Sequence, residues 1–248
     1  MIYCLARTLW LVTLWLDLFL FSLLMSALAL LPGRWTMGFY PALFQAWCRT
    51  FARALRVELR LHQHNRRPLP GRYILIANHP SAFEDIGIPA LFPVYSVAKQ
   101  EVADWWLVGR ISRAAGTLYL DRESRESRRA LAEQMVRTLE AGHNIAIYPE
   151  GGCKGRRIYE SFRQGAFEAS LRTGLPILPV FLHYEAQEDF EWDRQHLLHK
   201  IWQILTSRNS RANFHLFDAI EPVGFTSKED YARHVRGLYL AWQAKYLD

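Results

Sequence analysis

Five short apolar runs, separated by longer amphipathic stretches, occupy the middle of the chain and limit its fold more than any other feature. Runs of this length, rich in β-branched and aromatic residues, are typical of buried strands. They cover residues 73–77, 94–98, 117–120, 144–148 and 177–183, and helices are expected near 82–92, 101–114, 124–140 and 161–172. This alternation predicts an α/β fold, a mixed sheet flanked by helices with functional groups at the strand ends.

The N-terminal segment has a different character. From Thr8 to Leu31 it is apolar except for Asp17 and a few hydroxyl residues, which is long enough to cross a bilayer core of ~30 Å. Asp17 at mid-bilayer costs about 2.5–3.5 kcal/mol, a penalty that the surrounding apolar residues can outweigh. A signal peptide is the rival interpretation, since Ala27-Leu28-Ala29 resembles a cleavage site, but the run exceeds the ~7–15 residues of a signal core. We therefore expect a retained, membrane-associated helix.

A second helix is predicted after Pro41. Its apolar residues lie opposite a stripe of arginines at spacings of four, three and four, which are Arg49, Arg53, Arg56 and Arg60 against Phe44, Trp47, Phe51 and Leu55. This pattern indicates an interfacial helix, so that residues 5–61 would form a membrane-associated helical pair. The alternative is a helix that packs on the domain core and exposes a basic face to water.

Charge and domain organisation agree with a lipid surface. Residues 1–67 contain eight arginines but only Asp17 and Glu58 as acidic residues, so the whole formal charge of +6 lies there. A cationic excess at the most apolar end favours contact with anionic lipid and not with nucleic acid. We place the boundary in the basic, proline-containing stretch 63–70. Residues 1–67 then hold the N-terminal helices and linker, and residues 68–248 form the catalytic domain.

One histidine is a candidate catalytic residue. His79 follows the run 73–77 directly, and Glu84 and Asp85 lie about one helical turn into the next element. A carboxylate at that position can fix the imidazole tautomer and leave the other nitrogen free as a general base. The arrangement is a charge relay without a serine nucleophile. The alternative is an ion pair with a purely structural role.

Three further blocks follow the histidine in order. They are Gly116–Arg122, Ile147–Gly152 and Leu175–Val180. Together with the histidine block they resemble the glycerolipid and lysophospholipid acyltransferase family, which includes the 1-acyl-glycerol-3-phosphate acyltransferases. The resemblance covers about residues 70–185.

The chain departs from the family pattern at two positions. The family has aspartate where this chain has Glu84; we favour Glu84 as the partner of His79 and keep Asp85 as the alternative. Cys153 stands where the family has an arginine associated with the acceptor's phosphate. Lys154, Arg156 and Arg157 are candidate substitutes, although the ammonium of a lysine lacks the bidentate fork of a guanidinium.

The resemblance implies an acyltransferase mechanism. His79 would take the proton of an acceptor hydroxyl, and Glu84 or Asp85 would stabilise the imidazolium. The resemblance makes Arg122 a cation for the acceptor's phosphate or carboxylate and Glu150 an acceptor of a hydroxyl hydrogen bond. Gly151 and Gly152 would let backbone amides approach the substrate, with Lys154 beside them. No cofactor is implied, and acyl-CoA or acyl carrier protein would be the donor.

The expected reaction is acylation of 1-acyl-glycerol-3-phosphate to phosphatidic acid. Cys153 leaves open a lyso-ornithine lipid as the acceptor, and both departures leave open an inactive lipid-binding module. A thiol nucleophile at Cys153 with His79 as its base is a further alternative. The expected partners are membrane lipids, the lysolipid and the acyl donor, without nucleic acid. Since thioester donors are cytosolic, we expect the protein at the cytoplasmic face of a bacterial inner membrane.

Overall fold

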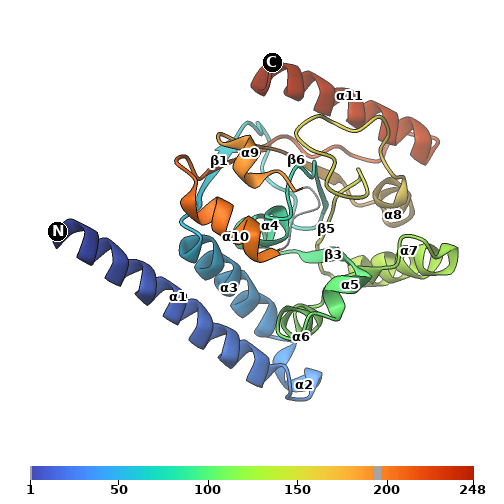
Figure 1. Ribbon diagram of the computed structural model, residues 1–248. Coiled ribbons are helices and arrows are strands. Elements are labelled where there is room, and N and C mark those ends of the chain that lie inside the picture. Colours follow the sequence, from blue (N-terminus) through green and yellow to red (C-terminus); the bar gives the residue numbers. More distant parts are fainter. Residues whose placement is uncertain (1, 193–196) are drawn as a thin grey trace.

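A seven-stranded sheet forms the centre of the protein (Figure 1). The computed structural model describes residues 2–192 and 197–248. The strands are β1 (Glu58–Gln63), β2 (Ile74–Ala77), β3 (Tyr95–Lys99), β4 (Leu118–Leu120), β5 (Ile145–Ile147), β6 (Ile177–Tyr184) and β7 (Arg211–Leu216). Their order is β1-β7-β6-β2-β5-β3-β4, and all neighbours are parallel except β6 and β7. The predicted mixed α/β sheet is thus confirmed.

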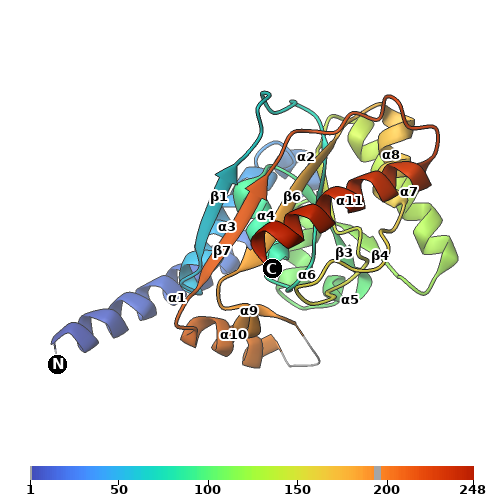
Figure 2. The same ribbon diagram turned by 90° about the horizontal axis from the view of Figure 1, so that it is seen from above.

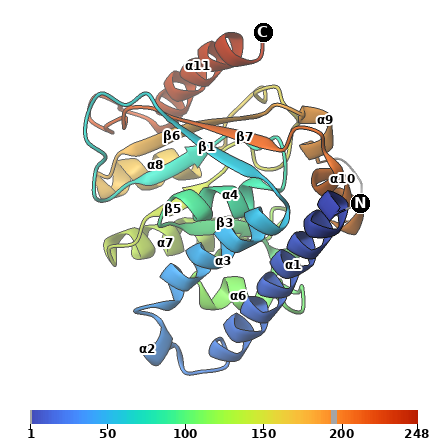
Figure 3. The same cartoon turned by 90° about the vertical axis from the view of Figure 1, so that its left-hand side faces the viewer.

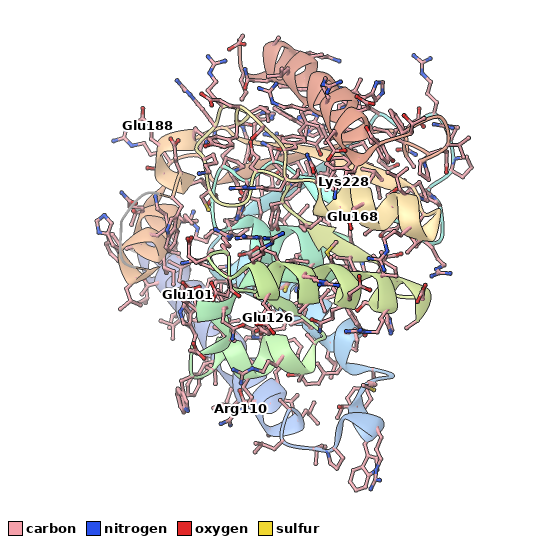
Figure 4. The ribbon with its side chains drawn as sticks, turned by 90° about the vertical axis from the view of Figure 1, so that its right-hand side faces the viewer. Glu101, Arg110, Glu126, Glu168, Glu188 and Lys228 are labelled. Carbon is pink, nitrogen blue, oxygen red and sulfur yellow. The ribbon has the colours of Figure 1, made fainter. Side chains whose placement is uncertain are left out.

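Helices cover both faces of the sheet. One face packs against α3 (Tyr40–Ala54), α4 (Glu84–Leu91), α9 (Gln187–Phe190) and α10 (Leu197–Thr206), and the other against α7 (Arg125–Glu140), α8 (Gly165–Thr173) and α11 (Lys228–Tyr246). Strand β2 is therefore buried on both sides: Leu75 faces the first layer and Ile76 the second. Lys228 and Glu168 form an ion pair of 2.6 Å that joins α11 to α8 (Figure 4).

The parallel strands β2, β5, β3 and β4 end at the same edge of the sheet. Residues that immediately follow these strands must therefore lie near one another. His79 follows β2, Arg122 follows β4, and Glu150 follows β5. The short helices α5 (Gln100–Ala103) and α6 (Val108–Ala114) connect β3 to β4 and close the side of this edge.

The N-terminal helix α1 (Ile2–Leu28) lies along α3 and contacts α6, and the short α2 (Gly33–Thr36) follows it (Figure 3). Two buried hydrogen bonds fix α1 to α3: Trp47 Nε1 donates to Ser22 Oγ at 2.8 Å, and Tyr40 Oη donates to the Met25 carbonyl at 2.9 Å. The outer face of α1 is apolar and exposed. Its segment Leu5–Leu28 is long and apolar enough to cross a membrane.

The predicted arginine stripe on one interfacial helix is wrong. Helix α3 ends at Ala54, Arg56 has a positive φ of 60°, and Arg60 lies in β1. Strand β1 pairs with β7, so residues 58–63 belong to the sheet and not to an N-terminal helix. The apolar side of α3 packs against α1, α4 and the core, which is the alternative that the sequence left open.

Four histidines form a stack on the β1, β7 and β6 side of the sheet, next to the end of α11. In this histidine stack (His62, His64, His183 and His215) the ring of His215 lies 4.7, 5.2 and 5.1 Å from the other three, and 3.9 Å from Tyr246. Burial lowers the pKa of His215 to about 3, with help from the neighbouring histidines and Lys245. Burial also lowers the pKa values of His64 and His183.

The histidine stack predicts a loss of stability in acid. Such a histidine has a lower pKa in the folded protein than the value of about 6.5 that it has in the unfolded chain. It contributes fully to the free energy of unfolding above pH 6.5, and this contribution falls as the pH drops toward the folded-state pKa. Between pH 7 and pH 5, His215 alone should lower the free energy of unfolding by about 2 kcal/mol. Denaturant titrations at both pH values measure this loss. In His215→Phe the free energy of unfolding should depend less on pH. An equal loss between pH 7 and pH 5 in that variant would contradict the assignment of this loss to His215.

Candidate active site

His79 and Glu84 form a buried pair at the carboxyl edge of the sheet. The asparagine–histidine–proline sequence ends β2, and Glu84 is the first residue of α4. His79 Nδ1 lies 2.7 Å from Glu84 Oε2, and the two side chains are 7% and 0% exposed. The carboxylate therefore fixes the tautomer in which Nδ1 carries the proton. Nε2 remains as the basic nitrogen.

Glu84 accepts further hydrogen bonds that favour its ionised form. The Ser81 amide donates to Oε2 at 2.9 Å, and the buried Tyr184 hydroxyl donates to Oε1. Burial raises the pKa of the Glu84 carboxyl well above its usual range, and the bonds from Tyr184 and Ser81 oppose that rise. Burial lowers the pKa of His79, which keeps the imidazole neutral and able to accept a proton.

Asp85, the alternative partner, lies beside the pair and does not contact the imidazole within hydrogen-bond distance. Tyr148 stacks on the His79 ring with centroids 4.1 Å apart and planes 9° apart, and it restricts the rotation of the imidazole. Burial raises the pKa of Asp85, while the nearby His79 opposes this rise. The geometry thus favours Glu84 as the orienting carboxylate.

Glu150 binds two main-chain amides beside the pair. Its Oε2 accepts the His79 amide at 2.7 Å, and its Oε1 accepts the Tyr159 amide at 2.9 Å. The residue is 2% exposed. These two bonds position the backbone of His79, and the role of Glu150 as an acceptor of a ligand's hydroxyl stays a prediction.

A pocket of about 500 Å³ opens in front of His79. One wall is apolar and comes from α3, α4 and α10, with Trp47, Phe51, Ile86 and Ile204 among its residues. The other side carries cations, namely Lys99 at the end of β3, Arg122 after β4, and Lys154. Such a pocket suits a molecule with an apolar chain and an anionic group. Lys200 of α10 also lines it, although this side chain is 2% exposed.

The glycine turn after β5 brings the backbone close to these cations. Gly151 has a φ of 75°, which glycine adopts without strain, and its amide donates to the Tyr148 carbonyl within the turn. A Cβ on Gly152 would lie 2.9 Å from Arg122 Nη1. A side chain at position 152 would therefore displace the Arg122 guanidinium from the pocket wall.

Cys153 lies 3.6 Å from His79 Nε2, measured from its Sγ. Burial raises the pKa of this thiol far above its usual range, and Glu84 and Asp85 add to the effect. The protonated thiol is a poor nucleophile. Its place beside the basic nitrogen marks the position that a reacting group must approach.

The sequence did not identify Tyr184, Lys99 and the pocket-lining residues Ile201 and Ile204 of α10 as parts of this site. Tyr184 is the last residue of β6, and a terminal tyrosine in an apolar strand has no local signal for a polar role. Lys99 ends β3 in the same way that other site residues follow their strands, so the strand-end argument applies to it. Among described residues, no group of three or more His, Cys, Asp or Glu is arranged to hold a metal ion.

Comparison with known proteins finds similarity over the part of the chain that contains this site. The sequence model of the acyltransferase family matches residues 58–183, which is 126 of the 248 residues. A 1-acyl-sn-glycerol-3-phosphate acyltransferase from Neisseria gonorrhoeae is 28% identical over 46% of this chain and 45% of its own length. The chain thus spans less than half of that relative.

Two other similarities extend over most of the chain. A lyso-ornithine lipid O-acyltransferase from Pseudomonas aeruginosa is 28% identical over 80% of this chain and 78% of its own length. The crystal structure of the 1-acyl-sn-glycerophosphate acyltransferase from Thermotoga maritima matches 97% of this chain and 96% of its own, with a TM-score of 0.70 and 18% identity. At that identity the match shows the shared fold.

Proposed function

Because the chain belongs to the acyltransferase family, we propose that it transfers a fatty acyl chain from an acyl thioester to the hydroxyl group of a lysolipid. The observation that carries this proposal is the contact of 2.7 Å between His79 and Glu84 at the wall of an apolar pocket. A base oriented by a carboxylate can remove the proton of an acceptor hydroxyl, and an apolar wall can bind acyl chains.

The chemistry follows from the free nitrogen of His79. Nε2 takes the proton of the acceptor hydroxyl as its oxygen attacks the thioester carbonyl, and Glu84 stabilises the resulting imidazolium. When the tetrahedral intermediate collapses, the carbon–sulfur bond breaks and the imidazolium returns the proton to the departing thiolate. The products are an ester and a free thiol. This sequence requires no covalent acyl-enzyme.

The acceptor that we favour is 1-acyl-glycerol-3-phosphate. Lys99, Arg122 and Lys154 on the pocket wall provide positive charge for a phosphate, and among the described residues Lys99 forms an ion pair with Glu101 at 2.5 Å. The relative from N. gonorrhoeae carries this substrate in its name. Acyl-CoA and acyl carrier protein are the donors to compare.

A lyso-ornithine lipid is the second candidate acceptor. Cys153 replaces a guanidinium at a position next to His79 Nε2, which lowers the positive charge where the headgroup would bind. The relative from P. aeruginosa, named for this activity, aligns over 80% of the chain. A headgroup with one carboxylate and one amine needs less positive charge than a phosphate does.

Membrane association is part of the proposal. The exposed outer face of α1 and its apolar length suit a lipid environment, and the positive charge of residues 1–67 suits anionic headgroups. Asp17 is exposed on this face, so we expect it near the headgroup level. Sedimentation with lipid vesicles tests this part separately from activity.

The deciding experiment is an assay of thiol release from long-chain acyl-CoA by the purified protein in detergent. It compares 1-acyl-glycerol-3-phosphate with a lyso-ornithine lipid, and His79→Ala serves as the control. Acceptor-dependent release that the variant loses supports the proposal, and the preferred acceptor decides between the candidates. Without release from acyl-CoA or acyl carrier protein, the protein is an inactive lipid-binding module.

Tyr184→Phe should lower turnover by about tenfold and move the acidic limb of the pH–rate profile upward. The variant removes a donor that favours ionised Glu84, so the pKa of this carboxyl should rise and the active form should be lost at higher pH. Tyr119→Phe, which removes a hydroxyl bonded to Ser112 away from the site, is the matched control. An unmoved limb in Tyr184→Phe would show that the hydroxyl is only structural.

Cys153→Ser should retain turnover within about threefold, because burial keeps the thiol protonated and the mechanism does not use it. The measurement is the same thiol-release assay, followed by mass spectrometry of the protein during turnover. An acylated Cys153, together with loss of activity in the serine variant, would establish a covalent mechanism instead.

A further inference from the structure

The apolar residues of α10 extend from its inner side onto its exposed surface. Its inner side lines the pocket with Ile201 and Ile204, and Ile204 is 4% exposed. Its outer side carries Leu198, which is 78% exposed, and Trp202, which is 63% exposed. These two residues are four apart and therefore neighbours on the helix surface. A helix that faces only water would carry polar residues there.

A second exposed apolar group lies on another part of the pocket rim. Trp105 lines the pocket, and the adjacent Trp106 is 82% exposed in the turn between α5 and α6. Figure 2 shows α10 and α5 along the same edge of the molecule, toward which the projecting N-terminal half of α1 also extends. Exposed tryptophans thus lie beside pocket-lining residues in two separate segments, α10 and the turn before α6.

Exposed arginines lie next to α10. The Ser210 hydroxyl donates to the Arg56 carbonyl at 2.6 Å, which places the end of α3 beside the segment that follows α10. The side chains of Arg53, Arg56 and Arg208 in these segments are exposed. Exposed tryptophan and leucine together with arginine are typical of surfaces at the membrane–water interface. These three arginines are complementary in charge to anionic phospholipid, whereas α9, which contacts α10, carries the exposed Glu188.

We infer that Leu198 and Trp202 of α10, together with Trp106, contact an anionic phospholipid surface and hold the mouth of the pocket against it. This contact is distinct from α1 and rests on the proposed function for its role. The lysolipid then passes from the lipid layer into the pocket along the inner side of α10 without crossing water. The exposed apolar residues of α10 lie at the outer end of that path, and Ile201 and Ile204 lie at its inner end.

The test compares wild type with the triple variant Leu198→Ser, Trp202→Ser, Trp106→Ser. The acceptor is offered once as long-chain 1-acyl-glycerol-3-phosphate in vesicles of phosphatidylcholine and phosphatidylglycerol, and once as a short-chain monomer. The rate on vesicles should fall by at least about tenfold in the variant, and the rate with the monomer should stay within about twofold. Equal rates on vesicles, or an equal fall in both assays, would overturn the inference.

A matched control is Val223→Ser. This valine is 88% exposed in the turn after β7, and because β7 is antiparallel to β6 the turn lies at the opposite end of the strands from the pocket. The control should behave as wild type does on vesicles. A loss as large as that of the triple variant would overturn the inference, since any exposed apolar residue would then have the same effect.

A second measurement does not depend on turnover. Vesicles of brominated phospholipid should quench the fluorescence of Trp202. The contribution of Trp202 is the difference in quenching between wild type and Trp202→Phe. Quenching supports the lipid contact even if the proposed acyl transfer fails. No quenching, with a dimer in solution that Trp202→Ser dissociates, would assign the surface to a second copy of the chain and overturn the inference.

Discussion

Replacing His79 with alanine should lower acceptor-dependent thiol release by about 10²- to 10⁴-fold, the range that a positioned general base contributes. The variant removes the nitrogen that takes the hydroxyl proton and leaves the pocket open. Steady-state rates with acyl-CoA and 1-acyl-glycerol-3-phosphate measure the effect. Because burial lowers the pKa of His79, the wild-type enzyme should keep its base form below pH 6.5.

As a control, circular dichroism and binding of the lysolipid should show that this variant is folded. His79 is buried against Tyr148, so alanine leaves a cavity and lowers stability, but Glu150 keeps both of its main-chain bonds because alanine retains the amide of residue 79. A folded His79→Ala protein with more than about a tenth of wild-type activity would exclude His79 as the general base.

Glu84→Gln should reduce turnover by about 10²- to 10³-fold. The amide oxygen can still accept from His79 and Ser81, and the amide nitrogen can donate to the Tyr184 hydroxyl, so the tautomer of His79 is preserved. Only the negative charge is lost. Removing one partner of a buried ion pair leaves the other uncompensated at a cost of about 3–5 kcal/mol, and here the uncompensated charge is the imidazolium formed during the reaction.

Asp85→Asn is the matched comparison because it neutralises the adjacent carboxylate. We expect a change of less than about tenfold, since Asp85 makes no hydrogen bond to the imidazole. The ratio of the two effects, measured with the same donor and acceptor, tests the assignment. A larger loss in Asp85→Asn than in Glu84→Gln would make Asp85 the orienting carboxylate and contradict the geometry.

The central part of the fold could be predicted from local sequence patterns. The five predicted strands agree with β2 to β6 within one residue at each end. Helix α7 also begins and ends where expected within one residue. These elements are buried on both faces or strongly amphipathic, so their hydrophobic pattern determines their type. The expected helix 101–114 is divided at residues 104–107 into α5 and α6.

Strands β1 and β7 could not be found in this way. Glu58 pairs with Arg211, so the contact joins segments 153 residues apart, and β1 alternates charged and apolar residues after a helix. The arginine spacing continued across the end of α3 by coincidence. The positive φ of Arg56 turns the chain from helix into strand, and no local propensity indicates this turn.

The candidate site could be predicted in part. The positions of His79 and Arg122 follow from strand ends, and the carboxylate of Glu84 follows from the spacing. The role of Glu150 could not be predicted, because its two amide partners, His79 and Tyr159, depend on how loops meet in three dimensions. Tyr184 reaches Glu84 from a strand 100 residues away and is equally invisible to local patterns.

Trp47 joins two parts of the protein that a shortened chain would separate. Its indole nitrogen holds Ser22 of α1, and its ring lines the pocket. Leu18 and Met25 of α1 are buried beside it in the same cluster as Tyr40. Trimming the N-terminus to obtain a protein that dissolves without detergent should therefore uncover the outer side of a substrate-binding wall. Biochemistry on this protein should begin with α1 in place.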